Sequence, residues 1–105
     1  MEGEKVKLVV YVPESHADMV RQAMGEAGAG VIGNYTHNSF SVKGVGRFKP
    51  ILGANPFIGK VGKFEEVTEE RIETVCYKKD LHKIIAAIKK VHPYEEVALD
   101  IYPLL

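Results

Sequence analysis

The spacing of apolar residues switches several times along this chain between the two-residue period of a β-strand and the longer period of an α-helix. Strand patterns fall over about residues 4–12, 31–48 and 64–78 and again from Val97 onward, and helical patterns over 14–28 and 81–91. Two right-handed crossings then place both helices on one face of a four-stranded antiparallel sheet. The sequence therefore predicts an α+β, ferredoxin-like βαββαβ fold with a long loop, about residues 49–63, between strands 2 and 3.

The first strand is predicted to be central in the sheet. Its even-numbered positions are apolar, and Val9 adds an apolar residue on the other face, so both faces are expected to be covered. Pro13 ends this strand. The helix that follows has one apolar face, and Gly28 suits its C-terminal stop. The apolar positions of these two elements are Val6, Leu8, Val10, Val12, Val20, Ala23, Met24 and Ala27.

The two middle strands are predicted from weaker patterns. Over 31–48 we expect one strand, which a glycine could interrupt with a bulge, with Phe40, Val42 and Val45 packing inward. Over 64–78 a helix competes with a strand because the segment contains five glutamates. The run 71–77 is rich in strand-forming residues and decides for a strand, with Ile72 and Cys76 on the same side.

The second helix has the clearest signals in the chain. Asp80 is a good N-cap, and His92-Pro93 stops the helix because the residue before proline avoids the α region. The apolar stripe between them is Leu81, Ile84, Ile85, Ile88 and Val91.

Length and composition limit the functional classes. One chain of 105 residues is expected to be one domain, 1–105, and its net charge of zero argues against a general nucleic-acid binder. The single cysteine, Cys76, allows no intrachain disulfide and is expected to act as a small buried hydrophobe. The apolar run from Leu8 to Val12 is too short for a signal segment or a membrane span, so a cytoplasmic location without a membrane partner is expected.

The loop region between strands 2 and 3 carries a basic segment. From Ala27 to Phe64 there is no Asp or Glu, and the segment 43–63 carries a charge of about +5 by side-chain counting. One interpretation is a glycine-rich loop that holds a phosphate or carboxylate, with Arg47 and Lys49 contacting the anion. The alternative is a hairpin whose basic side chains pair with the glutamates just downstream.

The histidines and the segment HPYEE, residues 92–96, are the other candidates for chemistry. His37 and His92 are candidate ligands of a divalent metal, although no two histidines have a metal-ligand spacing and turn or solvated histidines are the alternative. The sequence identifies no cofactor beyond this. Glu95 and Glu96 are consecutive, so on a strand they are expected to point to opposite faces and not to act as a paired acid and base.

Two long motifs bring in a family resemblance. GVGRFKPILGANPFIGKVGKFEEVTEERIE and HPYEEVALDIYPL resemble the Nif-three-like, or YqfO-like, family, and more narrowly the small inserted domain of its long members, which also occurs alone. That domain is similar to the CutA and PII signal proteins, which are ferredoxin-like and typically trimeric. The signature positions in this sequence are Gly44, Gly46, Arg47, Phe48, Pro50, Gly53, Ala54, Asn55, Pro56, Gly59, His92, Pro93, Tyr94, Glu95 and Glu96.

The resemblance implies a homotrimeric binding or sensing module with ligand sites at clefts between subunits, beneath the long loop. The candidate ligand-binding residues are Arg47, Lys49, Asn55, His92, Tyr94, Glu95 and Glu96. A purely structural or protein-interaction trimer is the alternative. A metal-dependent hydrolase is less favoured, because the dinuclear metal ligands of full-length members, often labelled a second type of GTP cyclohydrolase, lie in two flanking domains that this chain lacks.

Overall fold

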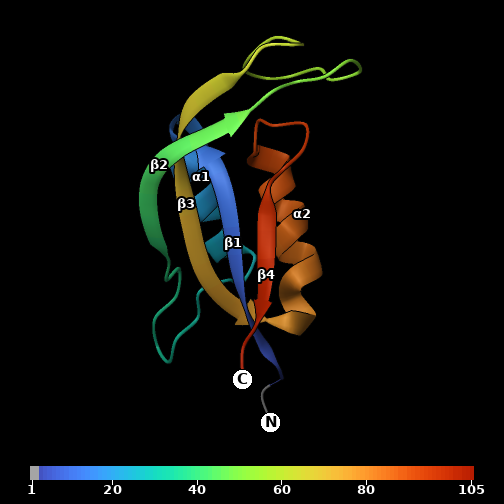
Figure 1. The fold of residues 1–105 in the computed structure, drawn as a ribbon. Helices are drawn as coiled ribbons and strands as arrows, with labels where there is room; N and C mark the ends of the chain where they lie inside the picture. The colour runs from blue at the N-terminus through green and yellow to red at the C-terminus, as the bar shows by residue number, and fades with distance from the viewer. Residues whose placement is uncertain (1–2) are drawn as a thin grey trace.

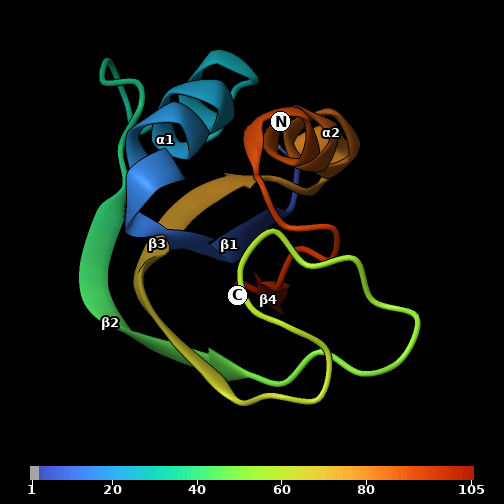
Figure 2. The same cartoon turned by 90° about the horizontal axis from the view of Figure 1, so that it is seen from above.

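The structure is a computed structural model that describes residues 3–105, and it consists of a four-stranded antiparallel sheet with two helices on one face (Figures 1 and 2). The strands lie in the order β2-β3-β1-β4, so β1 is central, and the predicted βαββαβ order is confirmed. The elements are β1 (Lys5–Pro13), η1 (Glu14–His16), α1 (Ala17–Glu26), β2 (Phe40–Phe48), β3 (Glu65–Tyr77), η2 (Lys78–Asp80), α2 (Leu81–Val91) and β4 (Leu99–Pro103).

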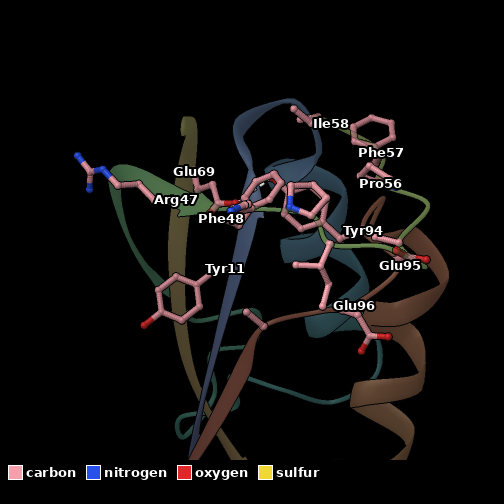
Figure 3. Close-up of a pocket in the computed structure, with 16 residues that line it drawn as sticks. Tyr11, Arg47, Phe48, Pro56, Phe57, Ile58, Glu69, Tyr94, Glu95 and Glu96 are labelled. Atoms are coloured by element: carbon pink, nitrogen blue, oxygen red, sulfur yellow. Dashed lines mark hydrogen bonds between the residues drawn. The ribbon is translucent and has the colours of Figure 1, made fainter. Parts of the chain in front are cut away.

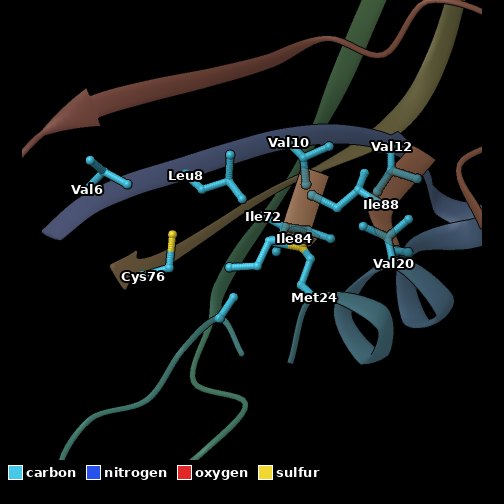
Figure 4. Packing of buried hydrophobic residues seen from close by; sticks show 12 residues of the cluster. Val6, Leu8, Val10, Val12, Val20, Met24, Ile72, Cys76, Ile84 and Ile88 are labelled. Carbon is cyan, nitrogen blue, oxygen red and sulfur yellow. The ribbon is translucent and has the colours of Figure 1, made fainter. Parts of the chain in front are cut away.

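The hydrophobic core lies between the sheet and the helices (Figure 4). Alternate residues of β1 and β3 point to the helices. Leu8 and Ile72 of these strands pack there with Ile84 and Ile88 of α2, and all four side chains are fully buried. Burying each such side chain contributes about 1.5–3 kcal/mol. Val9 is also fully buried although it lies on the other face, which confirms the central position predicted for its strand.

Both helices end where the sequence predicts, for identifiable reasons. Gly28 has a φ of 110° and donates its N–H to the Gly25 carbonyl, so the chain turns away after α1. His92 is extended before Pro93, which ends α2. The helix starts differ from prediction in detail: residues 14–16 form a 3-10 turn before α1, and Asp80 occupies the N-cap position of α2 without a side-chain capping bond.

The second strand is shorter than predicted. Only Phe40–Phe48 is a strand, while 31–39 forms a turn with one isolated bridge between Ile32 and Tyr35. This turn requires glycine at position 30, because φ is +83° and an added Cβ would lie 2.3 Å from the Asn38 carbonyl oxygen. The continuous pairing of β2 with β3 shows that the expected bulge is wrong.

The prediction that Phe40, Val42 and Val45 pack inward is also wrong, because all three side chains are exposed. The register pairs Phe40 with Glu73 and places it on the sheet face opposite the helices, which we call the open face. Val42 shares this face. Val45 lies on the other face, toward the helices, but it is exposed there. On the same face Ser41 accepts a hydrogen bond from the Arg21 guanidinium group.

The open face is covered partly by its own charged side chains. Glu73 of β3 lies 3.4 Å from the Lys7 ammonium group and 3.2 Å from the Arg71 guanidinium group. Toward the end of the sheet where β1 and β2 finish, residues 49–64 and 92–98 extend over this face (Figure 2). None of the helices described is long and apolar enough to cross a membrane.

Candidate functional site

A pocket of about 470 Å³ lies where the open face meets these two connecting segments (Figure 3). The sheet contributes Tyr11 from β1, Phe48 from the end of β2 and Glu69 from β3. The loop after β2 and the segment between α2 and β4 form the remaining walls. The lining is mainly apolar or aromatic: Tyr11, Phe48, Pro50, Ile51, Ala54, Pro56, Phe57, Ile58, Tyr94 and Ala98.

The loop that walls the pocket is tied down at both its base and its middle. At its base the Gly62 N–H donates to the carbonyl of Pro50, a buried residue, at 2.7 Å. In its middle the Asn55 N–H donates to the Glu95 carboxylate at 2.8 Å. Gly53 and Gly59 have φ of 102° and 97°, which only glycine adopts readily. These two hydrogen bonds and two glycines therefore fix the backbone of the loop in one conformation over the sheet.

Tyr94 lies at the centre of an aromatic cluster. Its ring centroid is 6.0 Å from that of Phe48 and 6.4 Å from that of Phe57, and the ring planes are inclined at 62° and 53°. Its hydroxyl donates to Glu69 at 2.9 Å. Burial, and then this bond to Glu69, raise the pKa of the Tyr94 hydroxyl, which keeps it protonated as a donor.

His92 supports Tyr94 from behind and does not line the pocket. It is buried, and its Nε2 lies 2.7 Å from the Tyr11 carbonyl oxygen, which can only accept. Its Nδ1 lies 3.2 Å from the Tyr94 N–H, which can only donate. These two neighbours require a neutral imidazole with the proton on Nε2. Burial lowers the pKa of His92, which agrees with that assignment.

The two basic candidates, Arg47 and Lys49, both belong to the pocket lining, but their charged groups bind elsewhere. The Arg47 side chain points away from the aromatic cluster (Figure 3), and its Nε donates to Glu66 at 2.7 Å. The Lys49 ammonium group lies 5.1 Å from the centroid of the Phe64 ring, which is not part of the lining. Of the five basic side chains in the segment 43–63, Arg47 pairs with a downstream glutamate, whereas Lys43 lies 3.7 Å from Glu14.

Glu95 and Glu96 are arranged differently from the sequence-based expectation. They lie in a bend before β4 and not on a strand, so the alternation rule does not apply to them, and both line the pocket. Glu95 holds the loop through Asn55. Within the part of the chain that the structure describes, we find no hydrogen bond or ion pair for the exposed Glu96 carboxylate.

The two candidate metal ligands lie in different places. His37 borders a small second cavity beside α1, next to Gly25 and Asn38, whereas His92 contacts Tyr11 and Tyr94. Across residues 3–105 no group of three or more His, Cys, Asp or Glu side chains is placed to hold a metal ion. Cys76 is buried in the core, and burial raises the pKa of its thiol.

Sequence reasoning did not select Tyr11, Phe57 and Glu69 as parts of a site. Tyr11 and Glu69 lie on the open face by strand alternation, so the correct register would have indicated both. Phe57 lies in an irregular loop, and no periodicity points to it. Asn55, by contrast, was selected, and it contributes its backbone N–H to the tie with Glu95.

The chain is similar to a segment of longer proteins. It is 56% identical over 98 residues to the GTP cyclohydrolase 1 type 2 homologs of Halalkalibacterium halodurans and Bacillus subtilis, and the match covers 93% of this chain and 26% of each relative. A solved Bacillus cereus protein related to NIF3 has a TM-score of 0.86 at 48% identity, over 99% of this chain and 26% of that one. The chain thus spans about a quarter of the length of these relatives. No protein-family model matches it.

More distant solved structures show the same fold. CutA from Archaeoglobus fulgidus, a divalent cation tolerance protein, has a TM-score of 0.63 at 16% identity, over 95% of this chain and 83% of that one. The B. subtilis GlnK-ATP complex has a TM-score of 0.59 at 17% identity, over 99% and 84%. These likenesses confirm the ferredoxin-like, CutA/PII-like fold predicted from the sequence.

Proposed function

We propose that residues 1–105 form one CutA/PII-like domain that binds a small molecule in the pocket beneath the long loop, self-associates as a homotrimer and acts as a sensing module. The observation that carries this proposal is the pocket itself. It has a volume typical of small-molecule sites, and its lining is mainly apolar with a few polar groups.

The pocket is also preorganised, which favours ligand binding. The loop is fixed by the bonds of Gly62 to Pro50 and of Asn55 to Glu95, so closing it over a ligand requires little further ordering. Long loops in small domains without secondary structure of their own are usually functional or disordered, and this one is held in a single path.

Self-association is supported by the surface of the sheet. The edge strands β2 and β4 each have one unpaired side, and exposed edges of this kind pair readily with another chain. Phe40 and Val42 of β2 are exposed on the open face, and Leu104 is exposed beyond β4. The family resemblance implies three subunits with the ligand sites between them.

Native mass spectrometry of the purified protein, followed by a thermal-shift screen of small molecules, tests this function. We expect a trimer mass and compounds that raise the melting temperature of the wild type. Ala54→Trp should abolish those shifts by filling the pocket, whereas Leu52→Trp, on the same loop at a position 93% exposed and outside the lining, should retain them. A monomer, or shifts that survive Ala54→Trp, would contradict the proposal.

A second candidate function is a purely structural or protein-interaction trimer, which the exposed apolar residues of β2 favour without the pocket. A bare trimer that no compound stabilises would support it. The hydrolase activity in the name of the relatives belongs to proteins about four times as long as the matched segment, so we do not propose it for this chain.

A further inference from the structure

The charges around the pocket are opposite to those that the basic loop suggests. The lining contains three carboxylates, Glu69, Glu95 and Glu96, which come from β3 and from the segment before β4. The two basic residues in the lining direct their charged groups elsewhere, Arg47 to Glu66 and Lys49 to the ring of Phe64. A ligand in this pocket therefore meets a negative field, because charges within a few ångströms dominate the potential in a partly enclosed cavity.

The aromatic rings add a second, independent preference for positive charge. The rings of Phe48 and Phe57 are inclined at 62° and 53° to that of Tyr94, so the three are not stacked as parallel plates. Each ring has negative potential on its faces, and an ammonium group within about 6 Å of a ring centroid is attracted to that face. Since Tyr94 is a neutral donor already bound to Glu69, it does not offer its proton to an anion.

We propose that the pocket binds a small organic cation, with its apolar body against Phe48, Phe57 and Tyr94 and its positive charge toward Glu69 and the two glutamates of the HPYEE segment. This inference rests on the proposed small-molecule function and specifies the ligand class. A compact inorganic anion would face the carboxylates and gain little from the aromatic walls. A planar or alkylated ammonium or heteroaromatic cation satisfies both features at once.

Three probes of nearly the same shape test the charge preference directly. N-methylquinolinium is cationic, quinoline is neutral at pH 7.5, and 2-naphthoate is anionic. Titration by two-dimensional NMR should shift the amide signals of Phe57 and Tyr94. We expect the cation to bind roughly tenfold more tightly than quinoline and more tightly still than 2-naphthoate, from the usual size of cation–π and nearby-charge effects.

A matched pair of variants separates the local carboxylate from the overall charge. Glu69→Gln should remove most of the preference for the cation over quinoline, whereas Glu26→Gln, the same charge change on the distant helix α1, should leave it intact. Equal or tighter binding of quinoline or 2-naphthoate would overturn the cation proposal while leaving a small-molecule pocket in place. If none of the probes shifts these signals, the cation proposal fails. If, in addition, no compound in the thermal-shift screen raises the melting temperature of the wild type, the proposed small-molecule function fails as well.

Discussion

Replacing His92 by leucine tests whether the imidazole fixes the wall of the pocket. The substitution roughly keeps the apolar bulk but removes both hydrogen bonds, leaving the Tyr11 carbonyl and the Tyr94 N–H without their partner. A buried polar group left unpaired costs about 1–3 kcal/mol. Because both hydrogen bonds are only part-buried, we expect the free energy of unfolding to fall by about 2–4 kcal/mol in total.

The same residue gives the protein a defined pH dependence. The pKa of His92 is lowered in the folded state, chiefly by burial, so below about pH 6.5 the unfolded chain binds more protons at this site than the folded chain does. The wild type should therefore lose stability as the pH falls below that value. The second proton has to go on Nδ1, where it would break the bond from the Tyr94 N–H. His92→Leu should remove this contribution.

Urea unfolding followed by circular dichroism at pH 7.5 and pH 5.5, at one fixed protein concentration, measures both effects. His82→Leu is the matched control, because His82 is exposed on α2. The reasoning is refuted if His92→Leu lowers stability by less than about 0.5 kcal/mol, well below the cost of one unpaired buried group. It is also refuted if the variant keeps the full pH dependence of the wild type.

Four further substitutions, one of them a control, test the fold. Gly30→Ala should lower the urea midpoint strongly, because the new Cβ would meet the Asn38 carbonyl at 2.3 Å, whereas Gly44→Ala, with nothing within 4 Å, should not. Ile84→Ala should cost about 2–5 kcal/mol in the same assay, because the side chain is fully buried in the core. Arg47→Ala should cost less than about 1 kcal/mol by thermal unfolding, because its ion pair is exposed.

Most elements of the fold are predictable from local periodic signals, which are strongest in the second helix. The stripe from Leu81 to Val91 and the alternation around Ile72 each fix one element and its buried side. The sequence pattern places Phe40 and Val42 wrongly because apolar, β-forming residues are usually buried, whereas this edge strand leaves both exposed on the open face. Sequence pattern reports which side a residue faces, and not whether anything covers that side.

The site was predictable only in part because it is assembled from distant segments. The loop and the HPYEE segment, both indicated by the motifs, lie beside the same pocket. Its charge was not predictable from the loop alone, because Glu69 comes from the middle of β3 and reaches the pocket only through the register of the sheet. Arg47 faces away for the same reason: it lies opposite Glu66, on the side of the sheet away from Phe48.

The pocket shares the open face with Phe40 and Val42 of β2, so under the proposed function we expect ligand binding to be linked to assembly. A second copy that covered Phe40 and Val42 would approach the rim formed by Phe48 and Tyr11. A ligand held between subunits binds only the assembled form, so it must strengthen association by mass action, whereas a ligand held within one subunit leaves association unchanged. Measuring the subunit dissociation constant with and without a bound probe therefore distinguishes a site shared between subunits from a site complete in one chain.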